Sequence, residues 1–126
     1  MQRRQSNGFT LVELLVVLTI IALLVSIVAP DYVGRVHRAE ETVLQENLTL
    51  MRDALDKHFA DRGRYPKTLD ELVSQRYLRA IPRDPLTQTN TSWLVVAPVD
   101  VQKGSVYDIH SGAKGVGSNG VPYERW

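Results

Sequence analysis

The sequence contains no cysteine, which excludes a disulfide framework and thiol chemistry. It also lacks an excess of charge of either sign, because its 15 Lys and Arg residues are balanced by 14 Asp and Glu residues. Such a balance argues against a nucleic-acid partner, which a strongly basic surface would attract. With 126 residues, the chain is long enough for one domain and too short for two full cores. The uneven distribution of its apolar residues is therefore its most informative feature.

A long apolar run lies near the N-terminus. Residues 1–8 are polar and include Arg3 and Arg4, whereas the 21 residues of 9–29 contain one ionisable group, Glu13. A helix of that length is about 31 Å long, close to the ~30 Å hydrocarbon core of a bilayer. Leu, Val and Ile occur on all sides of it, which is not the pattern of a soluble amphipathic helix. We expect this segment to span a membrane with its basic N-terminal end in the cytoplasm.

The border between the polar and apolar residues has an unusual order. Gly8 directly precedes Phe9, and Glu13 is the fifth residue after the glycine. A carboxylate within a spanning helix costs about 2.5–3.5 kcal/mol at mid-bilayer and usually has a partner, yet none is available in this helix. The apolar run is too long for a secretory signal peptide and lacks a small-residue cleavage site. A plain signal anchor would not explain the order Gly, Phe, Glu.

The hexapeptide Gly8 to Glu13, GFTLVE, follows a short basic leader and opens the apolar run. This combination resembles the N-terminal signal of type IV pilins and type II secretion pseudopilins. The resemblance implies that a prepilin peptidase cuts between Gly8 and Phe9 and methylates the new amine of Phe9. It also implies assembly through these residues, with the Phe9 ammonium of one subunit paired with Glu13 of a neighbour. Pairing is favourable because each group alone would be a poorly solvated charge.

One helix is expected to continue past the apolar run, over about 9–61. Pro30 lacks an N–H and predicts a kink or local loosening, with Gly34 as a second weak point. In the resembled family this region can lose regular structure when the subunit leaves the bilayer. Further along, apolar residues recur at intervals of three and four, as on one face of an amphipathic helix. Gly63 is a typical helix stop.

A small mixed head should follow this helix. The run from Thr68 to Glu71 is a capping box, in which Glu71 reaches back to the N-cap, and predicts a short helix ending near Gln75. Two runs rich in Val, Trp and Tyr, 92–97 and 105–109, predict antiparallel strands. Lys103-Gly104 is expected to form the hairpin turn between them.

The C-terminal part of the head is expected to be a loop followed by a short return to the sheet. Residues 111–120 include four glycines, which predicts a surface loop. Residues 121–126 are expected to rejoin the sheet and to anchor it with Tyr123 and Trp126.

Three runs in the head narrow the resemblance to the major pseudopilin group of type II secretion systems. They are RGRYP at 62–66, IPRDPL at 81–86 and YDIHSG at 107–112. The implied fold is α+β and pilin-like, with one long N-terminal helix packed on a head that contains a short helix and a small antiparallel sheet. The implied parts are a cleaved leader (1–8), a transmembrane and filament-core helix (9–29) and a periplasmic head (30–126).

The C-terminal loop departs from the pattern of this group. Major pseudopilins bind calcium in an Asp-rich C-terminal loop, as a hard cation prefers several oxygen ligands. Here residues 111–120 include no acidic residue and do include Lys114. The candidate calcium ligands that remain are Asp108, Ser111, Ser118 and Asn119. We expect no cofactor, and calcium at these residues is the open alternative.

Other tempting residues have simpler explanations. On a strand, Asp108 and His110 share a face while Ser111 faces away, so the three should not form a catalytic cluster. His37 and His58 lie among charged residues and are expected to be solvated or at an interface. The chain is therefore not expected to be an enzyme.

The resemblance implies a structural subunit that polymerises to drive folded proteins from the periplasm across the outer membrane. The implied location is the inner membrane, crossed once, with a periplasmic head. The expected partners are further copies in a helical filament, minor pseudopilins, the prepilin peptidase and an inner-membrane assembly platform, without nucleic acid or a small-molecule substrate. One alternative is a type IV pilin or minor pilin for adhesion, motility or DNA uptake, which the lack of a disulfide-bonded region and of a basic stripe disfavours. Another is a signal-anchored periplasmic binding module, which leaves Gly8, Phe9 and Glu13 unexplained.

Overall fold

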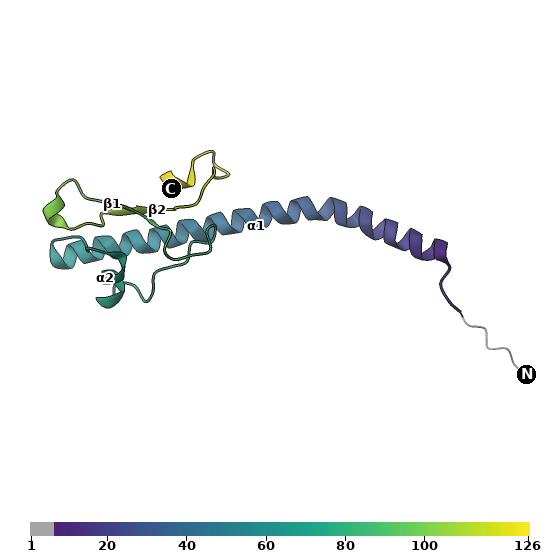
Figure 1. Cartoon of the computed structure of the whole chain (residues 1–126), viewed down its shortest axis with the longest axis horizontal. Coiled ribbons are helices and arrows are strands. Elements are labelled where there is room, and N and C mark those ends of the chain that lie inside the picture. The colour runs from purple at the N-terminus through teal and green to yellow at the C-terminus, as the bar shows by residue number, and fades with distance from the viewer. Residues whose placement is uncertain (1–6) are drawn as a thin grey trace, which may run out of the picture. The chain divides into compact units, whose positions relative to one another are not determined.

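The computed structural model describes residues 7–126 and has the expected α+β architecture of a long helix, a short helix and a small antiparallel sheet. Figure 1 shows the order along the chain, which is α1 (Leu11–Arg62), α2 (Leu69–Ser74), β1 (Leu94–Val96), the 3-10 helix η1 (Val101–Lys103), β2 (Asp108–His110) and the 3-10 helix η2 (Tyr123–Arg125). The chain divides into two compact units, residues 1–37 and 38–126, and α1 contributes to both. The leader residues Arg3 and Arg4 lie outside the described residues.

The first unit is the apolar part of α1. From Leu11 to Val28 the large apolar side chains are between 45% and 88% exposed. The two hydroxyl groups in this stretch bond to carbonyls one turn back, Thr19 to Leu15 at 2.8 Å and Ser26 to Leu23 at 2.7 Å. A helix that bonds its hydroxyl groups to its own backbone and exposes mainly apolar side chains, with Glu13 as the one ionisable group, suits a hydrocarbon environment. The described part of the chain contains one helix that is long and apolar enough to cross a membrane.

The helix continues without a break through Pro30 and Gly34. Because proline lacks an N–H, residue 30 cannot make the usual helix bond to the carbonyl of Ser26. A carbonyl without its helix partner is a local weakness, so loosening at this point stays a prediction.

The core of the second unit is built on one face of α1. Leu44, Leu48, Met51 and Leu55 follow each other at intervals of four and three and are each no more than 2% exposed. Other elements of the head complete this cluster with Leu72, Leu78, Trp93, Val106, Ile109, Ala113 and Tyr123. The expected amphipathic half of the helix is confirmed, and α1 ends at Arg62, next to Gly63 with its positive φ of 69°.

The short helix α2 begins at the expected N-cap. The side chain of Thr68 accepts a hydrogen bond from the N–H of Glu71 at 3.3 Å, and Leu72 is fully buried. The side chain of Glu71 was expected to reach back to the N-cap residue, and it bonds the preceding residue instead. The carboxylate of Glu71 accepts from the N–H of Lys67 at 2.6 Å, one residue before the N-cap. It also bonds Arg64 at 3.1 Å, so the carboxylate joins α2 to the link that follows α1.

The sheet is shorter than expected, and its connection is not a tight turn. Leu94, Val95 and Val96 pair antiparallel with His110, Ile109 and Asp108. The expected turn at Lys103-Gly104 is wrong, because the connection contains η1 and is too long for a hairpin turn. The carbonyl of Lys103 instead accepts from the N–H of Tyr65 at 2.6 Å, which fixes the connection to the link after α1.

Residues 121–126 do not return to the sheet as expected. Val116 and Pro122 form an isolated bridge, and the chain then turns into η2. Pro122 has no N–H to contribute to a strand ladder, which explains the turn. The anchoring role expected of the two aromatics agrees with the contacts, since the rings of Tyr123 and Trp126 are 5.1 Å apart and Tyr123 is buried.

Two glycines with positive φ give a matched stability test. A Cβ atom at Gly104, where φ is 113°, would lie 2.2 Å from the carbonyl oxygen of Tyr65, whereas a Cβ at Gly63 would meet nothing within 4 Å. Gly63→Ala carries the ~1 kcal/mol cost of a left-handed φ, whereas Gly104→Ala, with φ 113° and ψ −166°, enters a region essentially limited to glycine and must also move the backbone. We expect Gly104→Ala to lower the thermal midpoint of the full chain in detergent by clearly more than Gly63→Ala, followed by circular dichroism. Equal losses would show that the contact with Tyr65 is not restrictive.

Candidate functional site

The first candidate site is the N-terminal border. Gly8, Phe9 and Thr10 precede α1 without helical structure, and the Phe9 side chain is 83% exposed. Thr10 caps the helix, because its hydroxyl accepts from the N–H of Glu13 at 3.1 Å and its carbonyl accepts from the N–H of Leu14 at 3.1 Å. The peptide bond between Gly8 and Phe9 is therefore outside the helix, in an exposed segment.

The helix start also fixes where the acidic group lies. Glu13 is in the first turn of α1, where a carboxylate interacts favourably with the positive end of the helix dipole. Its side chain is exposed, and residues 9–29 contain no second ionisable group to neutralise it. Glu13 therefore places one negative charge at the N-terminal end of an apolar helix.

A second feature is the attachment of the C-terminal loop to the rest of the head. Glu41 of α1 is 5% exposed, and its Oε1 accepts hydrogen bonds from the N–H of Ser118 and the hydroxyl of Tyr123, both at 2.8 Å. The hydroxyl of Ser118 donates to the other carboxylate oxygen, Oε2. Burial, followed by the hydrogen bond from its hydroxyl to Glu41, raises the pKa of Tyr123 to about 12. One carboxylate therefore holds two points of the C-terminal segment.

A second buried carboxylate lies at the start of the loop. Asp84 is fully buried, and its Oδ2 accepts from the hydroxyl of Ser111 at 2.6 Å. Its Oδ1 accepts from the N–H of Leu86 at 2.9 Å, which closes a turn around Pro85 in the IPRDPL run. Asp84 therefore joins that turn to the residue that follows β2.

A cationic side chain completes the attachment of the C-terminal segment. The guanidinium of Arg52 bonds Oδ1 of Asp108 at 2.8 Å and the carbonyls of Ile109 and Trp126 at 2.9 and 2.7 Å. The ring of His110 contacts the same Trp126 carbonyl through Nδ1 at 2.5 Å. Ser111 bonds Asp84 instead, so Asp108, His110 and Ser111 do not converge on one point, as expected.

The four candidate calcium ligands are each engaged by a different protein group. Asp108 pairs with Arg52, Ser111 donates to Asp84, Ser118 donates to Glu41, and Oδ1 of Asn119 accepts from the N–H of Val121 at 3.0 Å. Lys114 in the same loop is bound to Glu124 at 3.2 Å. Among residues 7–126, no group of three or more His, Cys, Asp or Glu side chains is arranged to hold a metal ion. The donor set therefore does not fit a divalent cation that needs several oxygens and more than one negative charge.

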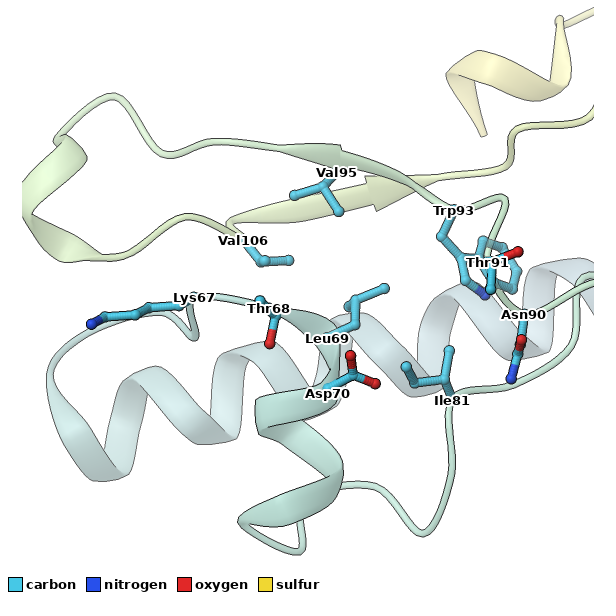
Figure 2. Close-up of a pocket in the computed structure, with 10 residues that line it drawn as sticks. All are labelled: Lys67, Thr68, Leu69, Asp70, Ile81, Asn90, Thr91, Trp93, Val95 and Val106. Carbon is cyan, nitrogen blue, oxygen red and sulfur yellow. The ribbon is translucent and has the colours of Figure 1, made fainter.

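A pocket of about 370 Å³ lies between α2 and the sheet. Figure 2 shows Leu69, Ile81, Trp93 and Val106 around it, with Lys67 and Asp70 among the polar residues of its lining. The indole N–H of Trp93 already donates to the carbonyl of Pro82 at 2.9 Å. The pocket is mainly apolar, and it holds no pair of acidic groups for acid–base chemistry.

One sequence-based expectation is wrong at His58. This side chain is fully buried rather than solvated, with Nδ1 2.7 Å from the carbonyl oxygen of Arg64 and Nε2 4.0 Å from the carboxylate of Glu71. The reason lies in the spacing along α1. Residue 58 follows Leu55 by three positions, and Glu41 precedes Leu44 by three, so both polar residues extend the buried face. The three-residue spacing could have indicated from the sequence that both side chains are buried. For Asp84, the available indication was its position between the two prolines of the IPRDPL run.

Comparison with known proteins agrees with the N-terminal geometry. Residues 3–29 match the family model described as the prokaryotic N-terminal methylation motif. Together with the exposed apolar start of α1 and the small α+β head, this match defines a pilin-like protein with a methylation signal.

Relatives extend the likeness over the whole chain. Type II secretion system core protein G of Klebsiella pneumoniae is 33% identical over 97% of this chain and 90% of its own length. The proteins with the same name from Klebsiella michiganensis and Aeromonas hydrophila are 30% and 33% identical, over 92% and 68% of this chain and 89% and 71% of their own lengths. The chain belongs to the family of type II secretion system core protein G. No solved structure gives a significant match.

The carboxylate of Glu71 gives a test of pH dependence. The N–H of Lys67 and the guanidinium of Arg64 hold the pKa of Glu71 below its ordinary value of 4.5, although burial opposes them. A lowered folded-state pKa contributes stability that is present above pH 4.5 and is lost as the pH falls through the folded-state value. We expect Glu71→Gln to be less stable than the wild type at pH 7, with a difference that shrinks towards pH 3, measured by urea unfolding.

The neighbouring residue gives a control for this test. Asp70 is exposed in the same helical turn, so Asp70→Asn should remain within about 0.5 kcal/mol of the wild type throughout. A Glu71→Gln deficit that stays constant from pH 7 to pH 3 would contradict the role of the ionised carboxylate.

Proposed function

We propose that this chain is a structural subunit of a type II secretion pseudopilus, a filament whose growth drives folded proteins from the periplasm across the outer membrane. The observation that carries the proposal is the apolar, exposed start of α1 within the matched N-terminal methylation motif, in a chain of the core protein G family. The subunit contributes surfaces for assembly and carries out no catalytic step.

The proposed assembly depends on two charges. A prepilin peptidase removes residues 1–8 and methylates the amine of Phe9, and the subunit waits in the inner membrane as a single-pass protein. On extraction into the filament, the ammonium of Phe9 pairs with Glu13 of a neighbouring copy in the bundle of helices. A dry charge without a partner costs roughly 3–5 kcal/mol, so the pairing selects the correct axial position of the incoming subunit.

The proposed orientation and partners follow from the same segment. Arg3 and Arg4 keep the leader in the cytoplasm by the positive-inside rule, which leaves the head in the periplasm. The partners are copies of this chain, minor pseudopilins, the prepilin peptidase and an inner-membrane assembly platform with a cytoplasmic ATPase. Loss of regular structure at Pro30 and Gly34 would let the apolar helix adapt from the bilayer to the filament.

The second candidate function is a type IV pilin or minor pilin. The methylation motif is compatible with it, because the motif is common to both groups. The relatives named core protein G favour the pseudopilin. Neighbouring genes discriminate between the two, since a secretin with further pseudopilins accompanies a secretion system and a retraction ATPase accompanies a pilus.

Processing of the leader is the first test of this function. Mass spectrometry of the membrane-extracted protein should give a chain that begins at Phe9 and carries one additional methyl group. Gly8→Leu should keep the leader, because a side chain at the cut prevents close approach of the peptidase to the backbone. Asn7→Ala, at the residue that precedes Gly8, should be processed normally. An intact chain that starts at Met1 in wild-type cells with an active peptidase would refute the processing.

Replacement of Glu13 tests assembly separately from insertion. Glu13→Leu should insert at least as well as the wild type, since it removes a charge from the apolar segment, and it should still be cut after Gly8. Filament formation on overexpression should fail, because each ammonium would be buried without a partner at a cost of roughly 3–5 kcal/mol. Immunoblots of mature subunit and electron microscopy of sheared filaments measure the two steps.

The conservative variant serves as the control for this experiment. Glu13→Asp keeps the charge with a shorter reach, so it should give an intermediate yield of filaments. Filaments of wild-type length and yield from Glu13→Leu would show that Glu13 is not an assembly contact.

A further inference from the structure

The C-terminal loop is bound to the head through two acidic side chains that are remote in the sequence. Glu41 receives three hydrogen bonds, two from Ser118 and one from Tyr123, across 77 and 82 positions of the chain. Asp84 receives the hydroxyl of Ser111 across 27 positions. Both acidic residues are buried, at 5% and 0% exposure. The two carboxylates thus hold the beginning and the end of the loop 111–120.

The donors around Glu41 leave little capacity for a cation. An N–H and two O–H groups donate to the carboxylate, so three of its roughly four acceptor positions are occupied. A single carboxylate offsets one unit of charge, and the loop 111–120 brings no second acidic group. Side-chain oxygens of the other candidate ligands are engaged as well, since Oδ1 of Asn119 accepts from the N–H of Val121 and Oδ1 of Asp108 is paired with Arg52.

We propose that Glu41 and Asp84 hold the C-terminal loop in place of a metal ion, so that the head of this chain folds and keeps its loop ordered independently of calcium. In this arrangement Glu41 is the principal positioning residue. It lies on the buried face of α1, three positions before Leu44, and therefore fixes Ser118 and Tyr123 to the helix that carries part of the core. The proposal concerns the folded subunit and does not depend on whether filaments form.

A carboxylate can hold the loop without the desolvation of a divalent cation. A hydrated divalent cation must lose its water shell to enter a loop, and it is retained only when several charged ligands compensate that loss. When a buried carboxylate receives charge-assisted hydrogen bonds from three protein donors, the carboxylate and the donors are all satisfied without an external ligand. Three of the glycines in the loop, at 115, 117 and 120, then allow the backbone to bring Ser118 back to α1.

Trypsin digestion of the loop gives a direct measurement. Lys114 lies in the loop with a side chain that is 91% exposed, so cleavage after it reports how often the loop leaves its bound conformation. The full chain in detergent is digested with either EGTA or about 1 mM calcium chloride, a concentration that saturates most extracellular calcium modules. We expect the same cleavage rate and the same thermal midpoint for the wild type in both buffers.

Two Glu→Gln substitutions on α1 distinguish the hydrogen bonds of Glu41 to the C-terminal loop from a general effect of removing a negative charge. Glu41→Gln removes the charge and points an NH₂ group at donors, so cleavage should become at least about fivefold faster in both buffers. Glu46→Gln, at an exposed position of α1, should behave as the wild type. If Glu41→Gln does not fold, Ser118→Ala removes only the hydroxyl of the pair and should still accelerate cleavage.

The possible outcomes distinguish a metal site from a loop held by Glu41. Slower cleavage of the wild type in calcium, or a midpoint that falls by several degrees in EGTA and returns only with calcium, would overturn the proposal in favour of a metal site. Wild-type cleavage rates in both Glu41→Gln and Ser118→Ala would overturn the positioning role of Glu41. Neither result would bear on leader processing or on the function of Glu13, which are measured on other residues.

Discussion

The structure depends on one constraint, which is that a single helix must be stable in two different solvents. The first part of α1 exposes apolar side chains on all sides and satisfies its hydroxyl groups internally, as lipid requires. The second part presents one buried face to a small head and polar side chains elsewhere. The head in turn is too small to bury much apolar surface by itself, so part of its core comes from helix residues such as Leu44, Met51 and Leu55.

Charged groups impose a second constraint, because a buried charge must have a partner. In the head, Glu41, Asp84 and Arg52 are each placed where they bind several backbone or side-chain groups of the C-terminal segment. These contacts replace the hydrogen bonds of a larger sheet, which this chain does not form over its described residues. The apolar part of the helix has the opposite property, because Glu13 has no ionisable partner within residues 9–29. The buried charged groups of the head are thus paired within one subunit, whereas the carboxylate of Glu13 is left for the proposed pairing with a neighbouring copy.

Much of this could be predicted from the sequence, for physical reasons. The length of the apolar run, the three-and-four spacing and the Thr68 cap depend on local periodicity and local hydrogen bonds, and each was confirmed. The hairpin turn at Lys103-Gly104 was wrong because the connection is fixed by a distant residue, Tyr65. The return of 121–126 to the sheet was wrong because Pro122 has no N–H to contribute to a strand ladder. Glu41 and Asp84 were overlooked because their partners are far away in the sequence, and His58 was expected to be solvated or at an interface although its spacing on α1 indicated burial. A polar residue on a buried face is stable only with partners that local sequence does not display.

The central claim is that Phe9 and Glu13 of neighbouring subunits neutralise each other in an assembled filament. A helical reconstruction by electron cryomicroscopy of filaments formed from the full chain measures this directly. The account predicts density that begins at Phe9, with the methylated amine of one subunit within about 4 Å of the Glu13 carboxylate of the next. Filaments in which Glu13 faces solvent, or in which residues 1–8 are still attached, would contradict it.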